Sequence, residues 1–559
     1  MTLNNLSLSH LPVKANDRRC WGELSGAGLA LELSSIVKRH PGFVVVLVPD
    51  MLVASKLERE LTFFLGSTEQ LGGQEQENGH ENPLLTFPDW ETLPYDTFSP
   101  HQDIISERLT TLYRLPDLKR GVLVVPATTL MHRLCPKDYL GQNTLLLNVG
   151  DTLDMETMRT RLLKSGYRCT PQVMEHGEFA IRGSLLDLFP MGSECPFRID
   201  LFGNTIDSIR LFDPDTQRSL EKVQEIRLLP AREYPLTDEV ITAFRTRWRQ
   251  QFEGDPRQSS VYLDVSQGIA AMGLEYYLPL FFEETHTLFD YIPDNCLMVK
   301  LGGVDLALNE FWQQVKDRFD QYGHDRQRPI LEPKNIFIEP DHIFRELKRF
   351  PQIQLTIEKV EDRPGYVNCG FHPLPELSVE SRHASPLARL QTWMDAFPGR
   401  ILFCAESAGR REVLRELLST HHLHAVETSS WSAFLESDIK RAMVIAPLEE
   451  GMLTERLLGT SKQGIAVITE SELLGKRVMQ RRRRKTRVQE PELAVRSLAE
   501  LAIDDPVVHL DYGIGRYLGL TYLTLSGQEG EFVTLEYAGG DKLYVPVASL
   551  HLISRYSSV

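Results

Sequence analysis

The chain has 559 residues, a length that predicts about four domains, with 42% hydrophobic and 25% charged residues, as in ordinary globular proteins. Its formal net charge of -16 excludes a general polyanion-binding protein, so contact with nucleic acid requires a local basic patch. Seven scattered cysteines without CxxC spacing argue against a disulfide framework and a zinc site. There is neither a signal-peptide pattern nor a run near the ~18 apolar residues of a membrane span, so we expect a cytoplasmic protein.

The N-terminal segment has the pattern of an α/β fold. Residues 43–48 form a continuous apolar run, which is typical of a buried parallel strand. A helix is predicted over 51–65, with Asp50 as its N-cap. A further apolar run at 121–126 predicts another strand of the same half-domain.

The loop before the first helix lacks the residues that bind a nucleotide phosphate. Gly26, Gly28, Leu29 and Ala30 stand where a nucleotide-binding fold carries G-x-G-K-[ST]. Apolar residues thus replace both the phosphate-neutralising lysine and the Mg-binding hydroxyl. We predict a degenerate, non-functional P-loop and no cofactor in this segment.

Residues 67–83 are rich in Gly, Gln, Glu and Asn, which predicts a flexible surface loop. The next segment, 88–115, reads as a loop that leads into a helix. It contains Trp90, Tyr95 and Phe98, for which we predict packing in the core.

A strand-rich stretch lies between Glu175 and Asp213. Strands are predicted at 177–181, 184–188, 197–202 and 205–212, and Gly203-Asn204 is a two-residue turn signal between the last two. By period-two alternation, Arg198, Asp200 and Phe202 share one face of their strand. An aromatic ring among charges on the solvent face indicates a protein-binding patch.

The α/β pattern returns after this stretch. Helix-like segments are expected at 238–252, 306–322 and 341–349, with a strand at 297–301. Residues 383–475 repeat strand and helix by themselves, with strands at 401–405, 442–446 and 464–469 and a helix at 410–418. His421, His422 and His424 have no partner at metal-ligand spacing, and cations at a helix C-terminus explain them more simply.

The strongly basic stretch 476–487, KRVMQRRRRKTR, is interpreted as a solvated linker, with transient contact to DNA or to an acidic face as the alternative. A short helix is expected at 491–501. Strands at 506–510, 516–525, 531–537 and 542–546 then predict a small antiparallel barrel. The G-x-G at 513–515 leads into a strand, which argues against a phosphate cradle.

Two strings carry a family resemblance. GEFAIRGSLLDLFP (177–190) followed by FRIDLFGNTIDSI (197–209) resembles the UvrA-binding domain of UvrB and of bacterial transcription-repair coupling factors (Mfd). VVHLDYGIGRYLGL (507–520) followed by EFVTLEYAGGDKLYVPVASLHLISRY (531–556) resembles the Tudor-like RNA-polymerase-interaction domain of CarD and the coupling factors. Because UvrB has no such module and needs the P-loop lysine, the resemblance favours the N-terminal half of a coupling factor.

The resemblance implies a multidomain α/β protein in six segments. They are 1–145, a degenerate UvrB-like α/β domain, first part; 146–230, an inserted β-rich UvrA-binding domain; 231–367, the α/β domain, second part; 368–474, a small separate α/β domain; 475–490, the basic linker; and 491–559, a Tudor-like β-barrel that binds RNA polymerase. In UvrB the region matching 88–115 contains an aromatic hairpin that holds damaged DNA. Here only Trp90, Tyr95 and Phe98 remain in the loop, which argues against that role.

The resemblance also implies site residues. Arg182, Arg198 and Phe202 would bind UvrA, with a structural salt bridge and a core phenylalanine as the alternatives. Leu523, with Arg516 and Thr521, would bind the β subunit of RNA polymerase through an exposed strand edge. A barrel-core position is the alternative for Leu523.

The function implied is an adaptor for transcription-coupled nucleotide excision repair, acting as a monomer. The family's ATP-dependent DNA translocase, with its ATP and Mg, has no motif in this sequence, so we expect no enzyme activity here. Two alternatives stay open: an ATP-dependent UvrB-like repair enzyme, and a CarD-type transcription regulator.

Overall fold

The computed structural model describes residues 11–66, 83–379, 386–454, 464–475, 506–509, 513–525, 528–537, 542–546 and 553–555. The chain forms two compact units, Met1–Arg477 and Val478–Val559. The predicted basic linker and the helix expected at 491–501 lie outside the described residues, as does the predicted loop at 67–83 except for Pro83.

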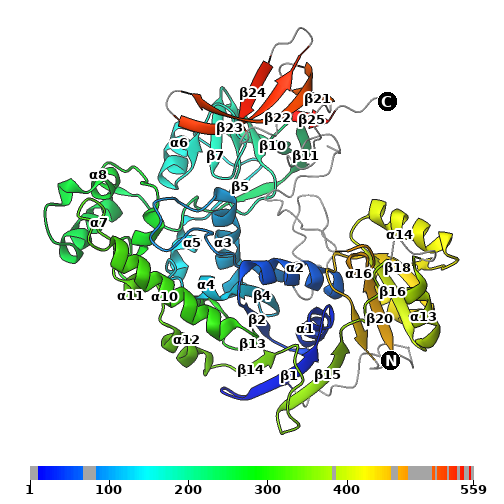
Figure 1. Cartoon of the computed structure of the whole chain (residues 1–559). Helices are drawn as coiled ribbons and strands as arrows, with labels where there is room; N and C mark the ends of the chain where they lie inside the picture. The colour runs from blue at the N-terminus through cyan, green and yellow to red at the C-terminus, as the bar shows by residue number, and fades with distance from the viewer. Residues whose placement is uncertain are drawn as a thin grey trace. The chain divides into compact units, whose positions relative to one another are not determined.

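A twelve-stranded sheet organises the first unit (Figure 1). Six of its strands pair with one another only in parallel; they are β1 (Arg18–Leu24), β14 (Gln352–Leu355), β13 (Leu297–Leu301), β2 (Phe43–Val48), β4 (Gly121–Pro126) and β3 (Leu84–Thr86), in this spatial order. All residues of β2 and β4 are buried, which confirms the strands predicted from their continuous apolar runs.

Both faces of these strands are covered. Val44 and Val46 share a core cluster with α1 (Gly28–Arg39) and α2 (Met51–Leu65). Val45 and Leu47 point the other way, into a cluster that includes α3 (Gln102–Arg114) and α10 (Val304–Tyr322). The Asp50 carboxylate accepts a hydrogen bond from the Val53 N–H at 2.9 Å, so the predicted N-cap of α2 is confirmed.

The sheet continues through strands of the later segment. They are β15 (Tyr366–His372), β19 (Met452–Thr454), β20 (Ile465–Thr469), β16 (Arg400–Ala405), β18 (Arg441–Ile445) and β17 (Val426–Glu427). β15 pairs with β1 in parallel, whereas its pair with β19 is antiparallel and joins Phe371 to Thr454 and His372 to Leu453. The Phe64 ring also meets the Trp431 ring edge-on at 5.3 Å between centroids. The segment predicted as a separate small domain therefore shares a sheet and a core cluster with the N-terminal segment.

The remaining helices of the first unit are mostly short. They are α4 (Ala127–Leu130), α5 (Lys137–Asn143), α6 (Met155–Lys164), α7 (Asp238–Gln251), α8 (Ser260–Ser266), α9 (Leu288–Tyr291), α11 (Pro333–Ile336), α12 (Pro340–Leu347), α13 (Ala388–Ala396), α14 (Ala408–Thr420), α15 (Trp431–Glu436) and α16 (Glu470–Leu474). The predicted helices at 238–252, 306–322, 341–349 and 410–418 are confirmed to within a few residues. Among the described residues, no helix combines the length and apolar character needed to cross a membrane.

The aromatic residues of 88–98 divide into two groups. Trp90 and Tyr95 are buried, as predicted. Both rings contact Tyr276. Phe98 is 62% exposed, so the prediction that it packs in the core is wrong. It lies in an irregular loop, where no side-chain period indicates which ring points inward.

A six-stranded sheet is inserted into the α/β fold; its strands run from cyan to blue-green in Figure 1. The order is β11 (Ser219–Val223), β10 (Thr205–Phe212), β9 (Phe197–Phe202), β8 (Leu185–Leu188), β7 (Glu178–Arg182) and β6 (Arg168–Cys169). The predicted hairpin is confirmed, with Gly203 at φ +64° in its turn. A separate pair, β5 (Leu145–Asn148) with β12 (Glu225–Leu228), flanks the insertion.

The second unit is a five-stranded antiparallel sheet. Its order is β24 (Lys542–Pro546), β23 (Gln528–Glu536), β22 (Gly513–Leu525), β21 (Pro506–His509) and β25 (Ile553–Arg555). Val507, Tyr517 and Val533 belong to its apolar cluster. Because β22 starts at Gly513, the G-x-G is already strand backbone, which agrees with the argument against a phosphate cradle.

Candidate protein-docking site on the inserted sheet

One face of the inserted sheet is apolar and the other is charged. Ile199, Leu201 and Ile209 are buried in the core cluster below the sheet. On the opposite face the register forms two rows of neighbouring side chains. The first row runs Ala180, Asp187, Arg198, Arg210 and Lys222, and the second runs Arg182, Leu185, Asp200 and Ser208.

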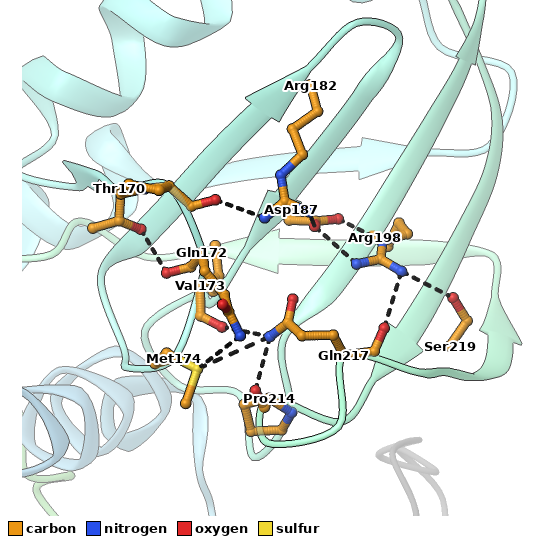
Figure 2. Close-up of polar contacts among 11 residues, drawn as sticks. Thr170, Gln172, Val173, Met174, Arg182, Asp187, Arg198, Pro214, Gln217 and Ser219 are labelled. Atoms are coloured by element: carbon orange, nitrogen blue, oxygen red, sulfur yellow. Dashed lines mark hydrogen bonds and ion pairs between the residues drawn. The ribbon is translucent and has the colours of Figure 1, made fainter. Parts of the chain in front are cut away.

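Asp187 holds Arg198 in place. Its two carboxylate oxygens accept hydrogen bonds from Arg198 Nε at 2.7 Å and Arg198 Nη2 at 2.9 Å (Figure 2). The carboxylate is only 3% exposed and the Arg198 side chain 19%, so this is a bidentate pair largely withdrawn from water. The hydrogen bond to Asp187 raises the pKa of Arg198 above its ordinary value.

Arg182 reaches the same carboxylate from the neighbouring strand. Its Nη1 lies 4.0 Å from Asp187 Oδ2, and its Nη2 donates to the Pro171 carbonyl at 2.6 Å. The side chain is 51% exposed, so the guanidinium is accessible to a partner. Figure 2 shows Asp187 lying between the two arginines.

Gln217 connects two loops beside the Asp187–Arg198 pair. Its backbone is left-handed at φ +58°, and its Nε2 donates to Pro214 O at 2.8 Å and Val173 O at 3.1 Å (Figure 2). Its own carbonyl accepts from Arg198 Nη1 at 3.3 Å. The Arg198 guanidinium also lies 4.8 Å from the Phe212 ring centre. These contacts fix the position of Arg198.

Phe202 is the exposed apolar member of this face. It ends β9, pairs with Thr205 and is 84% exposed, which rules out the alternative of a core phenylalanine. For Arg198 the structural salt bridge is present, whereas Arg182 has a looser ion pair. The structure therefore brings Arg182 and Arg198 together at Asp187 and leaves Phe202 on the same side of β9.

Sequence reasoning missed Asp187, Gln217 and Arg210. A signal for Asp187 was present, because an acidic residue inside the apolar run LLDLF needs a cationic partner when its strand is buried. Gln217 has no such signal, since its contacts depend on how two loops meet.

The loop predicted to be a degenerate P-loop contacts the protein's own backbone. The Ala27 N–H donates to Glu450 O at 3.2 Å. Gly26 has φ +54°, and a Cβ there would lie 1.8 Å from Gly451 O. A Cβ at Gly28 would meet the Phe371 side chain at 2.5 Å. Leu29 and Ala30 continue into α1, and the Ala30 side chain is buried.

The second unit offers a strand edge. β23 pairs with β22 from Arg516 to Leu525, whereas β21 pairs only with Gly513 to Arg516. Within the described strands, β22 beyond Arg516 therefore has one neighbour only. Thr521 Oγ1 lies 2.8 Å from Thr534 Oγ1 of β23. Leu523 pairs with Gly530, and its side chain lies outside the described part of the chain.

In the part of the chain that the structure describes, no three His, Cys, Asp or Glu side chains are grouped to hold a metal ion. His421 is the C-cap residue of α14, where a cation is favoured by the helix dipole.

Comparison with known families gives three matches. Residues 145–234 match the UvrB interaction domain, residues 393–473 match the D3 domain of MFD, and residues 501–557 match the CarD-like/TRCF RID domain. The charged face described above thus lies within a domain of the UvrB interaction class.

Curated relatives match over nearly the whole chain. The transcription-repair-coupling factors of Escherichia coli and Haemophilus influenzae are 44% and 43% identical over 98% of this chain and 46% of their own length. That of Bacillus subtilis is 24% identical over 95% of this chain and 44% of its own. The chain is therefore a homologue of the transcription-repair-coupling factors, which confirms the resemblance found in its motifs, and it spans about half the length of these relatives.

Proposed function

We propose that this chain is an adaptor for transcription-coupled nucleotide excision repair, which binds stalled RNA polymerase and recruits UvrA. The observation that carries the proposal is the presence of a UvrB interaction domain and a CarD-like/TRCF RID domain in one chain. Two docking modules on one polypeptide raise the effective concentration of one partner near the other.

The UvrA surface in this proposal is the charged face of residues 146–230. Arg182 supplies an accessible guanidinium and Phe202 an exposed ring, the residue types enriched at binding hot spots. Arg198, held by Asp187, supplies a charge that is already in position and loses little conformational entropy on binding.

The polymerase surface is the open edge of β22 in residues 491–559. Such an edge binds a partner strand through main-chain hydrogen bonds, with side chains adding specificity. We assign the partner as the β subunit, with Arg516, Thr521 and Leu523 as contact residues. We further propose that the five strands close into a Tudor-like barrel.

The proposal assigns the remaining segments supporting roles. Residues 1–145 and 231–367 form the degenerate UvrB-like scaffold, 368–474 the small α/β part, and 475–490 a linker that contacts DNA weakly. The chain acts as a monomer in the cytoplasm without a cofactor or a reaction of its own. DNA translocation, with ATP and Mg, belongs to parts of the family outside this sequence.

The competing hypothesis is a nucleotide-dependent repair enzyme. The contacts of Gly26 and Ala27 with Glu450 and Gly451 argue against it, because a backbone carbonyl occupies the loop that would bind phosphate. Saturable ATP binding by this chain that is lost on changing Gly28 would favour the enzyme. A CarD-type regulator would bind polymerase but not UvrA.

The test is a pull-down of purified UvrA and of the polymerase β-subunit lobe. The double variant Arg182→Ala/Phe202→Ala should lose UvrA alone, and Leu523→Arg should lose polymerase alone. Retention of both partners by both variants would overturn the assignment of the two surfaces.

A further inference from the structure

The inserted sheet places like charges on adjacent strands. Arg198 of β9 pairs directly with Arg210 of β10, and Arg210 pairs with Lys222 of β11. Directly paired side chains have Cβ atoms about 4.5–5.5 Å apart, and like charges in that position destabilise a sheet. Such a row needs a compensating anion.

The carboxylates on this face do not supply it. Asp187 is the neighbour of Arg198 on the side away from Arg210, and both of its oxygens bind Arg198. Asp200 pairs with Ser208 and so lies only diagonal to Arg210. The two rows together carry four basic side chains and two carboxylates, the basic ones being Arg182, Arg198, Arg210 and Lys222.

Polar atoms near the row also lack partners. Arg210 Nε and Ser208 Oγ are buried from water and make no hydrogen bond within the described structure. A buried donor without an acceptor carries a desolvation penalty, which is relieved when the partly exposed Arg210 side chain turns to meet a ligand oxygen. Lys222, at the end of the row, is exposed.

We propose that Arg210 and Lys222 extend the docking site into a basic row that binds carboxylates of the partner. The inference rests on the proposed function, which makes that partner UvrA, and adds that UvrA contributes an acidic segment lying across β9, β10 and β11. Three adjacent strands span about 10 Å, which matches acidic residues two or three positions apart on an extended segment. Arg210 is then the specificity-determining residue of the row, because its Nε has no acceptor in the described structure, whereas Arg198 is already hydrogen-bonded to Asp187.

The experiment measures the Kd of the chain for purified UvrA at low and moderate salt. Arg210→Ala should raise Kd about tenfold, and its binding should depend less on salt than that of the unmodified chain. Arg210→Lys should keep most of the affinity and Arg210→Gln should not, since only the first retains the charge. The matched control is Arg227→Ala, an exposed arginine of β12 that stacks on Tyr113 outside the row.

The outcomes separate the two levels of inference. If Arg198→Ala weakens binding and Arg210→Ala does not, the basic row is wrong and the proposed function stands. Equal loss in Arg210→Lys and Arg210→Gln would overturn the charge role in favour of packing. If changes at Arg182, Arg198 and Phe202 also leave UvrA binding intact, the proposed function itself fails.

Discussion

Arg108 Nε donates to Glu233 Oε1 at 2.5 Å, and both side chains are almost completely buried. Arg108 belongs to α3, whereas Glu233 lies at the end of the segment that matches the UvrB interaction domain. The Arg108 Nη1 also donates to Pro88 O at 2.8 Å, and its guanidinium lies 4.4 Å from the Phe87 ring centre. The buried Arg108–Glu233 ion pair therefore links the inserted domain to the α/β fold.

Removing one member of the pair should therefore destabilise the junction. Arg108→Ala leaves an uncompensated buried carboxylate and should lower the free energy of unfolding by about 3–5 kcal/mol. Denaturant unfolding followed by circular dichroism measures this. Arg257→Ala, which breaks an exposed pair with Asp255, is the control and should be nearly neutral. Similar losses in both variants would contradict the role given to Arg108.

Asp187→Asn should weaken UvrA binding through Arg198. The asparagine keeps the shape of the side chain but cannot hold the guanidinium by a charged bidentate pair, so we expect Kd to rise about five- to tenfold. In the Arg198→Ala background the same change should cost nothing further, because the two residues act as a unit. Glu32→Gln, which disrupts a buried carboxylate paired with Arg39 outside the inserted domain, is the control. Additive effects of the two changes would show that Asp187 does not act through Arg198.

Glu60 should make stability depend on pH. Burial, together with the nearby Glu449 and Glu450, raises the pKa of Glu60 to about 7, while Lys56 opposes the shift. Between about pH 4.5 and 7 the folded chain keeps this proton and the unfolded chain loses it, so the free energy of unfolding falls as pH rises. Glu60→Gln removes the ionisation and should stabilise the chain by about 1–3 kcal/mol at pH 8 and very little at pH 4.5.

Unfolding free energies across this pH range, for the chain and the variant, provide the check. The control is Glu416→Gln, an exposed glutamate of α14, which should leave the pH profile unchanged. If the free energies of unfolding of Glu60→Gln and the unmodified chain change in parallel with pH, the raised pKa of Glu60 is not the cause of the pH dependence.

Gly26→Ala should destabilise the first unit. The methyl group would collide with Gly451 O, and the left-handed backbone at φ +54° disfavours any side chain. Gly66→Ala is the matched control, because Gly66 also has a positive φ of +75° but has open space around it. The melting temperature should fall clearly further for Gly26→Ala, and equal shifts would mean that the contact with Gly451 is unimportant.

Local signals were sufficient for much of the fold. The apolar run of β2, the Asp50 cap of α2 and the turn at Gly203 each specify their element within a few residues, and all were predicted. The pairing of Phe371 with Thr454 was not, because it joins strands about eighty residues apart through register alone. On the charged face, too, local sequence predicts only part of the structure. Alternation placed Arg198 and Phe202 on the same face correctly, whereas the contacts of Asp187 and Gln217 depend on neighbouring strands and loops.

The main-chain carbonyl of Glu450 gives the Ala27 N–H an acceptor that belongs to the same chain. In a phosphate-binding loop the acceptor is a ligand oxygen, which leaves the loop when the ligand dissociates. Here the acceptor is covalently part of the chain, so the fold itself fixes its concentration near the Ala27 N–H. The loop at Ala27 and the segment at Glu450 are therefore coupled through the main chain.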